Sequence, residues 1–256
     1  MEKLSVIIIT KNEENCIREC LESVKWADEI VIVDSGSTDK TEDICREYTD
    51  KFFYNEWPGS NRQRQLAADK CSNRWTVFID ADEAVSPELA KNIQSLLKTE
   101  PEYDVYKMLR RNYYRDKPAE YGVMHPKPEI RLFRRDRVKF IDRSTHAKLV
   151  YGGKCGWVKG YLEHYNITEL KEWYEKNLRY ARACAEDDFA KGKRVGFRHF
   201  AELPNLFFRR YILWRGFMHG VPGLVFSAMP VFFRLVHYSI MWELQSNNCK
   251  EKLNRQ

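Results

Sequence analysis

The sequence has no C-x-x-C pair, and its seven cysteines are an odd number. This pattern fits neither a disulfide framework nor a zinc ribbon, so we expect reduced thiols in a cytoplasmic protein. The chain does not open with a basic region followed by a long apolar run, so we expect no signal peptide. The uncharged run at 216–233 contains glycines and prolines and has arginines on both sides. We therefore expect no simple transmembrane helix there.

Other absences limit the possible functions. No glycine-rich phosphate loop follows the first predicted strand, which argues against a nucleotidyltransferase. No RNA-binding motif is present, so we expect no nucleic-acid partner, although the net charge of +6 favours anionic ligands. Of the 256 residues, 43% are hydrophobic and 31% are charged. This composition is typical of a globular protein rather than a disordered one.

The first hundred residues alternate apolar runs with amphipathic segments. The apolar runs predict strands at 5–10, 29–34, 52–54 and 75–79. The segments between and after them predict helices at 13–24, from Asp39, at 61–71 and from Ser86-Pro87. Strands separated by helices imply right-handed parallel crossovers, so we expect a doubly wound, Rossmann-like α/β sheet.

The pattern changes after this part of the chain. From about 105 to 165 it predicts short strands, with a hairpin at Gly152-Gly153 between strands at 147–151 and 155–158. Residues 168–191 predict a long helix. Residues 203–244 are aromatic, rich in arginine and broken by glycine and proline. We therefore expect two domains, 1–165 and a helical, aromatic and basic region at 166–256.

Polar side chains stand at the ends of three predicted strands, namely Thr10, Asp34 and Asp80. In a doubly wound sheet, ligands bind beyond the carboxyl ends of the strands. Residues 80–83 hold three carboxylates, whose mutual repulsion a divalent cation would relieve. Oxygen ligands suit Mg²⁺ or Mn²⁺. The alternative is a solvated acidic turn before the helix at Ser86.

Asp34 opens a second acidic loop, at 34–39, which follows a buried strand. Its carboxylate can accept hydrogen bonds from a ribose or a base edge, while Gly36 allows a sharp turn. Asp39 caps the next helix, but Asp34 has no such local role in this interpretation. We therefore interpret Asp34 as a ligand contact.

Three motifs together resemble the inverting family 2 glycosyltransferases of the GT-A fold. They are residues 5–13, residues 31–39 and the D-x-D segment at 78–83, in the order and spacing of that family. The resemblance covers roughly residues 3–165. Within the family, the sequence is most similar to the bacterial β-1,4-glucosyltransferases of the lipopolysaccharide inner core.

The resemblance implies a role for each matching residue. Thr10 and Glu13 would line the nucleoside pocket, and Asp34 would hold the base or ribose. Asp80 would touch ribose or metal, and Asp82 would coordinate the metal. Two further residues match family positions: Arg64, which would face the nucleotide unless it is an exposed helix arginine, and His164, which would be a third metal ligand unless it is structural.

The catalytic base is where the sequence departs from the family. Members commonly carry His-Glu after the segment that matches 131–134, whereas this chain has Thr145-His146-Ala147. Asp142 could replace the missing carboxylate, or His146 could take the proton itself because its unperturbed pKa is about 6.5. The base could also lie elsewhere.

The aromatic and basic tail predicts contact with a membrane, because rings and cations both suit the headgroup level. Packing of these helices on the catalytic sheet is the alternative. We therefore expect metal-dependent transfer of glucose from a UDP-sugar to a lipid-anchored glycan, such as the heptose of the lipopolysaccharide inner core. The protein would lie peripherally on the cytoplasmic face of the inner membrane. The competing hypothesis is a catalytically impaired nucleotide-binding scaffold at the membrane.

Overall fold

The computed structural model describes residues 2–114, 117–143, 146–167 and 170–253, without the side chains of 142, 143, 146–148, 166, 167, 172, 176 and 248–253. The chain forms two compact units. The first comprises Met1–Asn112 and Pro126–Asn166, and the second comprises Tyr113–His125 and Ile167–Gln256. The first unit contains most of the strands, and the second is mainly helical.

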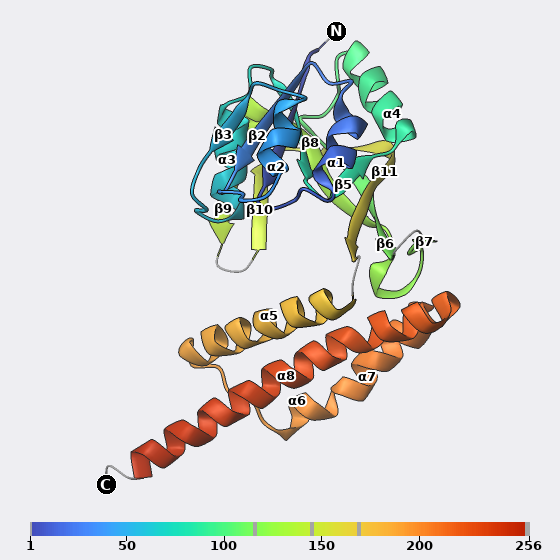
Figure 1. Ribbon diagram of the computed structural model, residues 1–256. Helices are drawn as coiled ribbons and strands as arrows, with labels where there is room; N and C mark the ends of the chain where they lie inside the picture. The colour runs from blue at the N-terminus through green and yellow to red at the C-terminus, as the bar shows by residue number, and fades with distance from the viewer. Residues whose placement is uncertain (1, 115–116, 144–145, 168–169, 254–256) are drawn as a thin grey trace. The chain divides into compact units, whose positions relative to one another are not determined.

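One half of the sheet in the first unit is parallel (Figure 1). Its strands are, in sheet order, β3 (Phe52–Tyr54), β2 (Glu29–Asp34), β1 (Leu4–Thr10) and β4 (Trp75–Asp80). β1 pairs in parallel with β2 on one side and with β4 on the other. These strands are continuous apolar runs because both of their faces are covered. The predicted doubly wound α/β fold is confirmed.

The helices of the first unit cover opposite faces of this sheet. They are α1 (Ile17–Val24), α2 (Thr41–Arg46) and α4 (Pro87–Lys98) on one face and α3 (Ser60–Asp69) on the other. Ile8 of β1 packs in the core with α1 and α4, whereas its neighbour Ile7 packs with α3. The predicted cap at Ser86 is confirmed, because its hydroxyl accepts a hydrogen bond from the Leu89 N–H at 3.3 Å.

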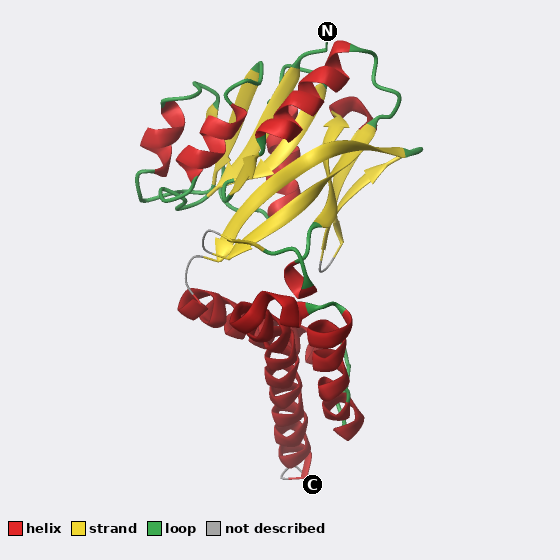
Figure 2. Cartoon of the chain, turned by 90° about the vertical axis from the view of Figure 1, so that its right-hand side faces the viewer, coloured by secondary structure: helices red, strands yellow, loops and turns green. Residues whose placement is uncertain are grey.

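The other half of the sheet is antiparallel. Beyond β4 follow β8 (Lys127–Arg134), β6 (Val105–Tyr114), β11 (Cys155–Ile167) and the short β5 (Glu83–Val85). β8 runs antiparallel to both β4 and β6, and β11 runs antiparallel to β5. The last pairing matters for the site, because it sets His164 opposite Glu83. Figure 2 shows the strands of this mixed, curved sheet.

A separate two-stranded sheet consists of β9 (Val138–Arg143) and β10 (His146–Tyr151), after the 3₁₀ turn η2 (Arg135–Arg137). The predicted hairpin at Gly152-Gly153 is wrong. β10 pairs with β9, while β11 belongs to the main sheet. The apolar side chains Phe140 and Leu149 explain this pairing, because they pack with α3 in the core that covers the second face of the main sheet.

The second unit is a helical assembly. It contains β7 (Lys117–Pro118), η1 (Gly122–Met124), α5 (Leu170–Ala190), α6 (Phe197–Ala201), α7 (Leu203–Phe208), the π-helical turn η3 (Arg209–Leu213), η4 (Gly216–His219) and α8 (Gly220–Leu253). The predicted break by glycine and proline is wrong after residue 220, because α8 continues through Pro230. Proline removes one helix hydrogen bond. The packing of α8 along α5 (Figure 1) compensates for that loss.

Gly160 tests how closely β11 and α4 approach. Its φ is +106°, and a Cβ at this position would lie 2.6 Å from the backbone of Leu89. We predict that Gly160→Ala costs about 3 kcal/mol of unfolding free energy, from backbone strain and overpacking together. Gly153→Ala is the control, because its φ is also positive but no atom lies within 4 Å. Equal losses in urea unfolding would contradict the predicted close contact.

Candidate active site

Three predicted site residues lie at neighbouring strand ends. Thr10 pairs with Asp34 across β1 and β2, and Ile9, the residue before Thr10, pairs with Asp80 across β1 and β4. The hydroxyl oxygen of Thr10 is buried and has no hydrogen-bond partner among the described residues. A buried polar atom without a partner is costly, so this hydroxyl is a place where a ligand would gain a bond.

The Asp34 carboxylate organises its own loop. One oxygen accepts hydrogen bonds from the N–H groups of Gly36 and Ser37, both at 2.8 Å, and the other accepts one from the Ser37 hydroxyl at 2.5 Å. Gly36 has a φ of +86°, which glycine adopts without strain. Asp34 therefore stabilises its own loop, although it does not cap α2. Its contact with a ligand stays a prediction.

The loops after β1 and β2 are joined by side-chain hydrogen bonds. Asn12, with a φ of +56°, donates its N–H to the Ser37 hydroxyl at 2.8 Å, and its side-chain oxygen accepts from the Thr38 N–H at 2.8 Å. The backbone N–H of Glu13 donates to the Thr41 hydroxyl at 2.8 Å, and the Glu13 carboxylate accepts a hydrogen bond from the Cys16 thiol at 3.0 Å. Glu13 therefore lies in an ordered loop beside the strand ends.

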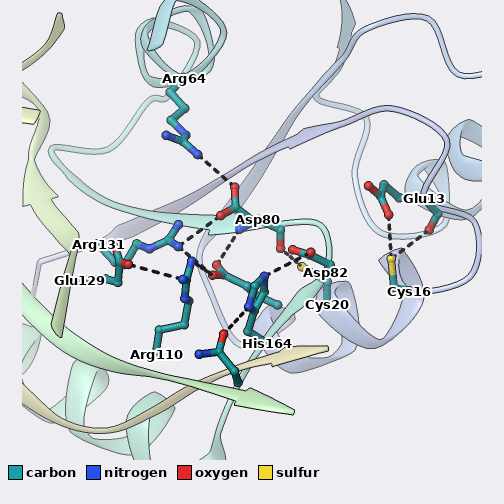
Figure 3. A network of polar contacts seen from close by, with 12 residues as sticks. Glu13, Cys16, Cys20, Arg64, Asp80, Asp82, Arg110, Glu129, Arg131 and His164 are labelled. Atoms are coloured by element: carbon teal, nitrogen blue, oxygen red, sulfur yellow. Dashed lines mark hydrogen bonds and ion pairs between the residues drawn. The ribbon is translucent and has the colours of Figure 1, made fainter. Parts of the chain in front are cut away.

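Two arginines hold the Asp80 carboxylate (Figure 3). Arg64 from α3 contacts one oxygen and Arg131 from β8 contacts the other, both at 3.2 Å. Both guanidinium groups also lie over the Phe78 ring, 4.0 and 4.5 Å from its centroid. Burial disfavours the charge on Asp80, but Arg131 and Arg64 outweigh burial and hold the pKa of the carboxyl below its usual value. Arg64 is thus no exposed helix arginine, since its side chain is 18% exposed.

Glu83 and Arg131 form a buried ion pair that sequence reasoning missed. Their side chains are 0% and 4% exposed, and the Glu83 carboxylate lies 2.7 Å from Arg131. Glu83 also accepts the Asp80 N–H at 2.9 Å and faces Arg110 at 3.9 Å. Burial raises the pKa of Glu83 above its usual value, whereas the neighbouring Arg131 guanidinium opposes the shift and favours the charged carboxylate. The sequence signal for this pair was an arginine placed between the apolar residues Ile130 and Leu132 of β8.

Asp82 and His164 form the part of the site that fits a divalent cation. The His164 Nε2 lies 3.3 Å from an Asp82 oxygen, and its Nδ1 lies 2.8 Å from the Asn112 side-chain oxygen. An oxygen can only accept, so Nδ1 carries the proton and, in the neutral ring, Nε2 turns a lone pair toward Asp82. Two facing lone pairs suit a cation, and an imidazole held in this way is typical of metal sites.

The donor set is incomplete as a protein-only metal site. Among the side chains that the structure describes, no group of three or more histidines, cysteines or carboxylates is arranged to hold a metal. Asp80 is turned toward its arginines, so Asp82 and His164 supply the two available ligands. Mg²⁺ and Mn²⁺ commonly complete such sets with water and substrate phosphates. The ligand set Asp80, Asp82 and His164 stays a prediction.

The two base candidates, Asp142 and His146, have side chains outside the described part of the chain. Their backbones belong to the β9–β10 hairpin. That hairpin is tied to α3, because the buried Asn61 donates its side-chain N–H to the Ile141 carbonyl at 2.5 Å. α3 also carries Arg64, so the hairpin is attached to an element of the candidate site.

Comparison of the sequence with known proteins identifies the family of this chain. The sequence profile described as glycosyl transferase family 2 matches residues 5–152. The chain belongs to this family. It is 31% identical to the lipopolysaccharide core biosynthesis glycosyltransferase LpsC of Rhizobium meliloti, over 88% of this chain and 89% of that protein. It is also 30% identical to an uncharacterized glycosyltransferase of Rickettsia typhi, over 95% of this chain and 88% of that protein.

Solved structures with detectable likeness are more distant. The Staphylococcus aureus TarS fragment 1–349 in complex with UDP-GlcNAc is 15% identical, with a TM-score of 0.49 over 96% of this chain and 92% of that one. The Mycobacterium tuberculosis glucosyl-3-phosphoglycerate synthase in complex with Mn²⁺ and UDP-glucose is 18% identical, with a TM-score of 0.48 over 67% of this chain and 74% of that one.

The buried pair predicts a large stability effect. We expect Arg131→Met to cost about 3–5 kcal/mol of unfolding free energy, because it leaves the Glu83 carboxylate buried without its partner. Adding Glu83→Gln should recover part of the loss. Arg134→Met is the control on the same strand. Its partners Asp104 and Asp136 are 37% and 50% exposed, so it should cost about 1 kcal/mol or less. Comparable losses in urea unfolding for the two single variants would refute the effect of burial.

Proposed function

We propose that this family 2 glycosyltransferase transfers glucose, with inversion, from a UDP-sugar to a lipid-anchored glycan, such as the heptose of a lipopolysaccharide inner core. The observation that carries the proposal is the alignment of Thr10, Asp34 and Asp80 at adjacent strand ends, beside the Asp82–His164 pair. Similarity to a lipopolysaccharide core glycosyltransferase supports the choice of acceptor.

The residues at the strand ends bind the donor in this proposal. Thr10 offers a buried hydroxyl without a protein partner among the described residues, and Glu13 lies in the loop that follows it. The Asp34 loop is ordered before the ligand arrives, which reduces the entropy lost on binding. Arg64 and Arg131 hold Asp80 in one orientation, and from there it would contact the ribose.

Asp82 and His164 would hold Mg²⁺ or Mn²⁺. When bound, such an ion neutralises the negative charge that develops on the nucleoside diphosphate leaving group. Asn112 keeps the proton of His164 on Nδ1, so that Nε2 stays available as a ligand. The β11–β5 pairing brings His164 to this place, and the Tyr165 N–H fixes it further by donating to the Asp82 carbonyl at 3.1 Å.

The acceptor hydroxyl must lose a proton as it attacks the anomeric carbon from the face opposite the diphosphate. Asp142 or His146 accepts that proton in this proposal. Both belong to the β9–β10 hairpin, which is tied to α3. A carboxylate or a neutral imidazole is a competent base near neutral pH. The nucleoside diphosphate leaves as an anion, so the site needs no general acid to protonate it.

Residues 166–256 form a membrane-associated domain in this proposal, and the protein lies peripherally on the cytoplasmic face of the membrane. A lipid-anchored acceptor is confined to that surface, so attachment would bring enzyme and acceptor together. The aromatic and arginine-rich composition of 203–242 supports the assignment.

Binding of the nucleotide tests the donor site. We expect UDP to bind only with Mn²⁺ or Mg²⁺ present, and Asp82→Asn to weaken that binding by about 10–100-fold or more, since loss of even an outer-shell partner lowers metal affinity by about 10–100-fold. Isothermal titration with UDP, with and without EDTA, measures it. Asp69→Asn, at the exposed end of α3, is the control and should bind as the wild type does. Equal UDP affinity in EDTA, or no binding at all, would sink the proposal.

The base is tested by two single variants, Asp142→Asn and His146→Ala. The true base variant should lower the rate of transfer by about 10²–10⁴-fold. Its affinity for UDP should stay unchanged, because the base acts on the acceptor. Transfer and donor hydrolysis are measured separately. Full activity in both variants would remove both candidates, and absent activity in the wild type would favour the scaffold hypothesis.

A further inference from the structure

The second unit exposes a series of apolar side chains along the segment where α7 turns into α8. We call residues 208–224 the α7–α8 turn. It includes η3 and η4, and its exposed members include Leu213, Trp214, Phe217, Met218, Val221 and Leu224. Val221 is 74% and Leu213 is 62% exposed. Apolar side chains gathered at this level of exposure mark an interaction surface.

The turn is ordered although it exposes apolar groups. The Trp214 N–H donates to the Arg209 carbonyl at 2.9 Å, and the Trp214 carbonyl accepts the Gly122 N–H at 2.8 Å. Gly216 packs so closely that a Cβ on it would lie 2.6 Å from the Ser227 hydroxyl. These contacts fix the backbone of the turn. The exposed side chains therefore belong to a defined surface.

The charge around the turn has one sign. No aspartate or glutamate occurs at residues 203–242, which contain the arginines 209, 210, 215 and 234. Arg209 and Arg215 of the turn are exposed. Arginines beside exposed aromatic and aliphatic side chains match the boundary between anionic headgroups and acyl chains. A protein partner offers no comparable reason for a stretch of forty residues without a carboxylate.

The rest of α8 does not suit hydrocarbon. By length and composition alone, the described segment Gly216–Asn247 could cross a membrane. However, α8 packs along α5, and its buried His237 lies 3.3 Å from Asp188 of α5. Farther along α8, Gln245 exchanges hydrogen bonds with the backbone of Val195, at 2.6 and 3.0 Å. α5 also carries the exposed ion pair Arg182–Glu186, and its Asp187 pairs with Lys191, the residue just beyond the end of the helix. Such charges exclude the α5–α8 pair from a bilayer core.

We propose that the α7–α8 turn inserts into the interfacial layer of a bilayer that contains anionic phospholipid, and that α8 does not cross the bilayer. The turn supplies the apolar insertion, and its arginines supply the attraction to the anionic headgroups. This inference deepens the proposed membrane association and rests on it, but it does not depend on the sugar, the donor or the metal.

The test is sedimentation of the full chain with phosphatidylcholine vesicles, with and without phosphatidylglycerol. The wild type should bind the anionic vesicles. A variant with Leu213→Glu and Val221→Glu should bind at least about 25-fold more weakly, since each charge near the surface changes binding about fivefold. The matched control carries Phe197→Glu and Trp242→Glu, which are 86% and 60% exposed but outside the turn. It should bind within about threefold of the wild type, because distant charges are screened.

Two more measurements complete the experiment. Arg209→Gln and Arg215→Gln should each weaken binding to anionic vesicles about fivefold. Tryptophan quenching by brominated lipid should fall in Trp214→Phe and stay unchanged in Trp242→Phe. The inference is overturned by three results: no vesicle binding by the wild type, equal loss in the control variant, or retention in the membrane after an alkaline carbonate wash, which indicates a spanning helix. UDP affinity, measured in parallel, should be the same in all variants. Absence of UDP binding would therefore count against the proposed function and not against this inference.

Discussion

The candidate site depends on how the fold neutralises three carboxylates within residues 80–83. Each carboxylate has a different environment. Asp80 lies between Arg64 and Arg131, and Glu83 is buried against Arg131. Asp82 faces the His164 ring, with no arginine among its described partners. Because the arginines already compensate two of the charges, the third is the one for which a cation would be most favourable. Adjacent residues thereby take distinct roles.

Much of the parallel half of the fold could be predicted from the sequence. Apolar strands that end in polar residues gave β1, β2 and β4 almost at their observed bounds, and with them the meeting of Thr10, Asp34 and Asp80. The local periodicity of a buried parallel strand is a strong signal. The antiparallel half was less accessible, because its pairing depends on long-range contacts. β9 was missed, and the hairpin was therefore assigned to the wrong strands.

Within the site, residue types were easier to predict than partners. A carboxylate can bind a ligand, cap a loop or pair with an arginine, and the sequence does not distinguish these choices. Asp34 bonds its own loop, and Glu83 is fully buried on β5, which was not predicted. The same limit applies to α8. Its length and apolar composition would allow it to span a membrane, whereas its packing against the charged α5 argues against a position in the bilayer core. Tertiary partners decide each case.

The central claim is that Asp82 and His164 together provide the metal position beside the strand ends. Pulsed electron paramagnetic resonance of Mn²⁺ bound with UDP tests it directly, because it detects a coordinated nitrogen. We expect a histidine nitrogen coupling in the wild type that disappears in His164→Gln and persists in His199→Gln, whose ring lies on α6. Bound Mn²⁺ without nitrogen coupling in the wild type, or with coupling unchanged in His164→Gln, would contradict the account.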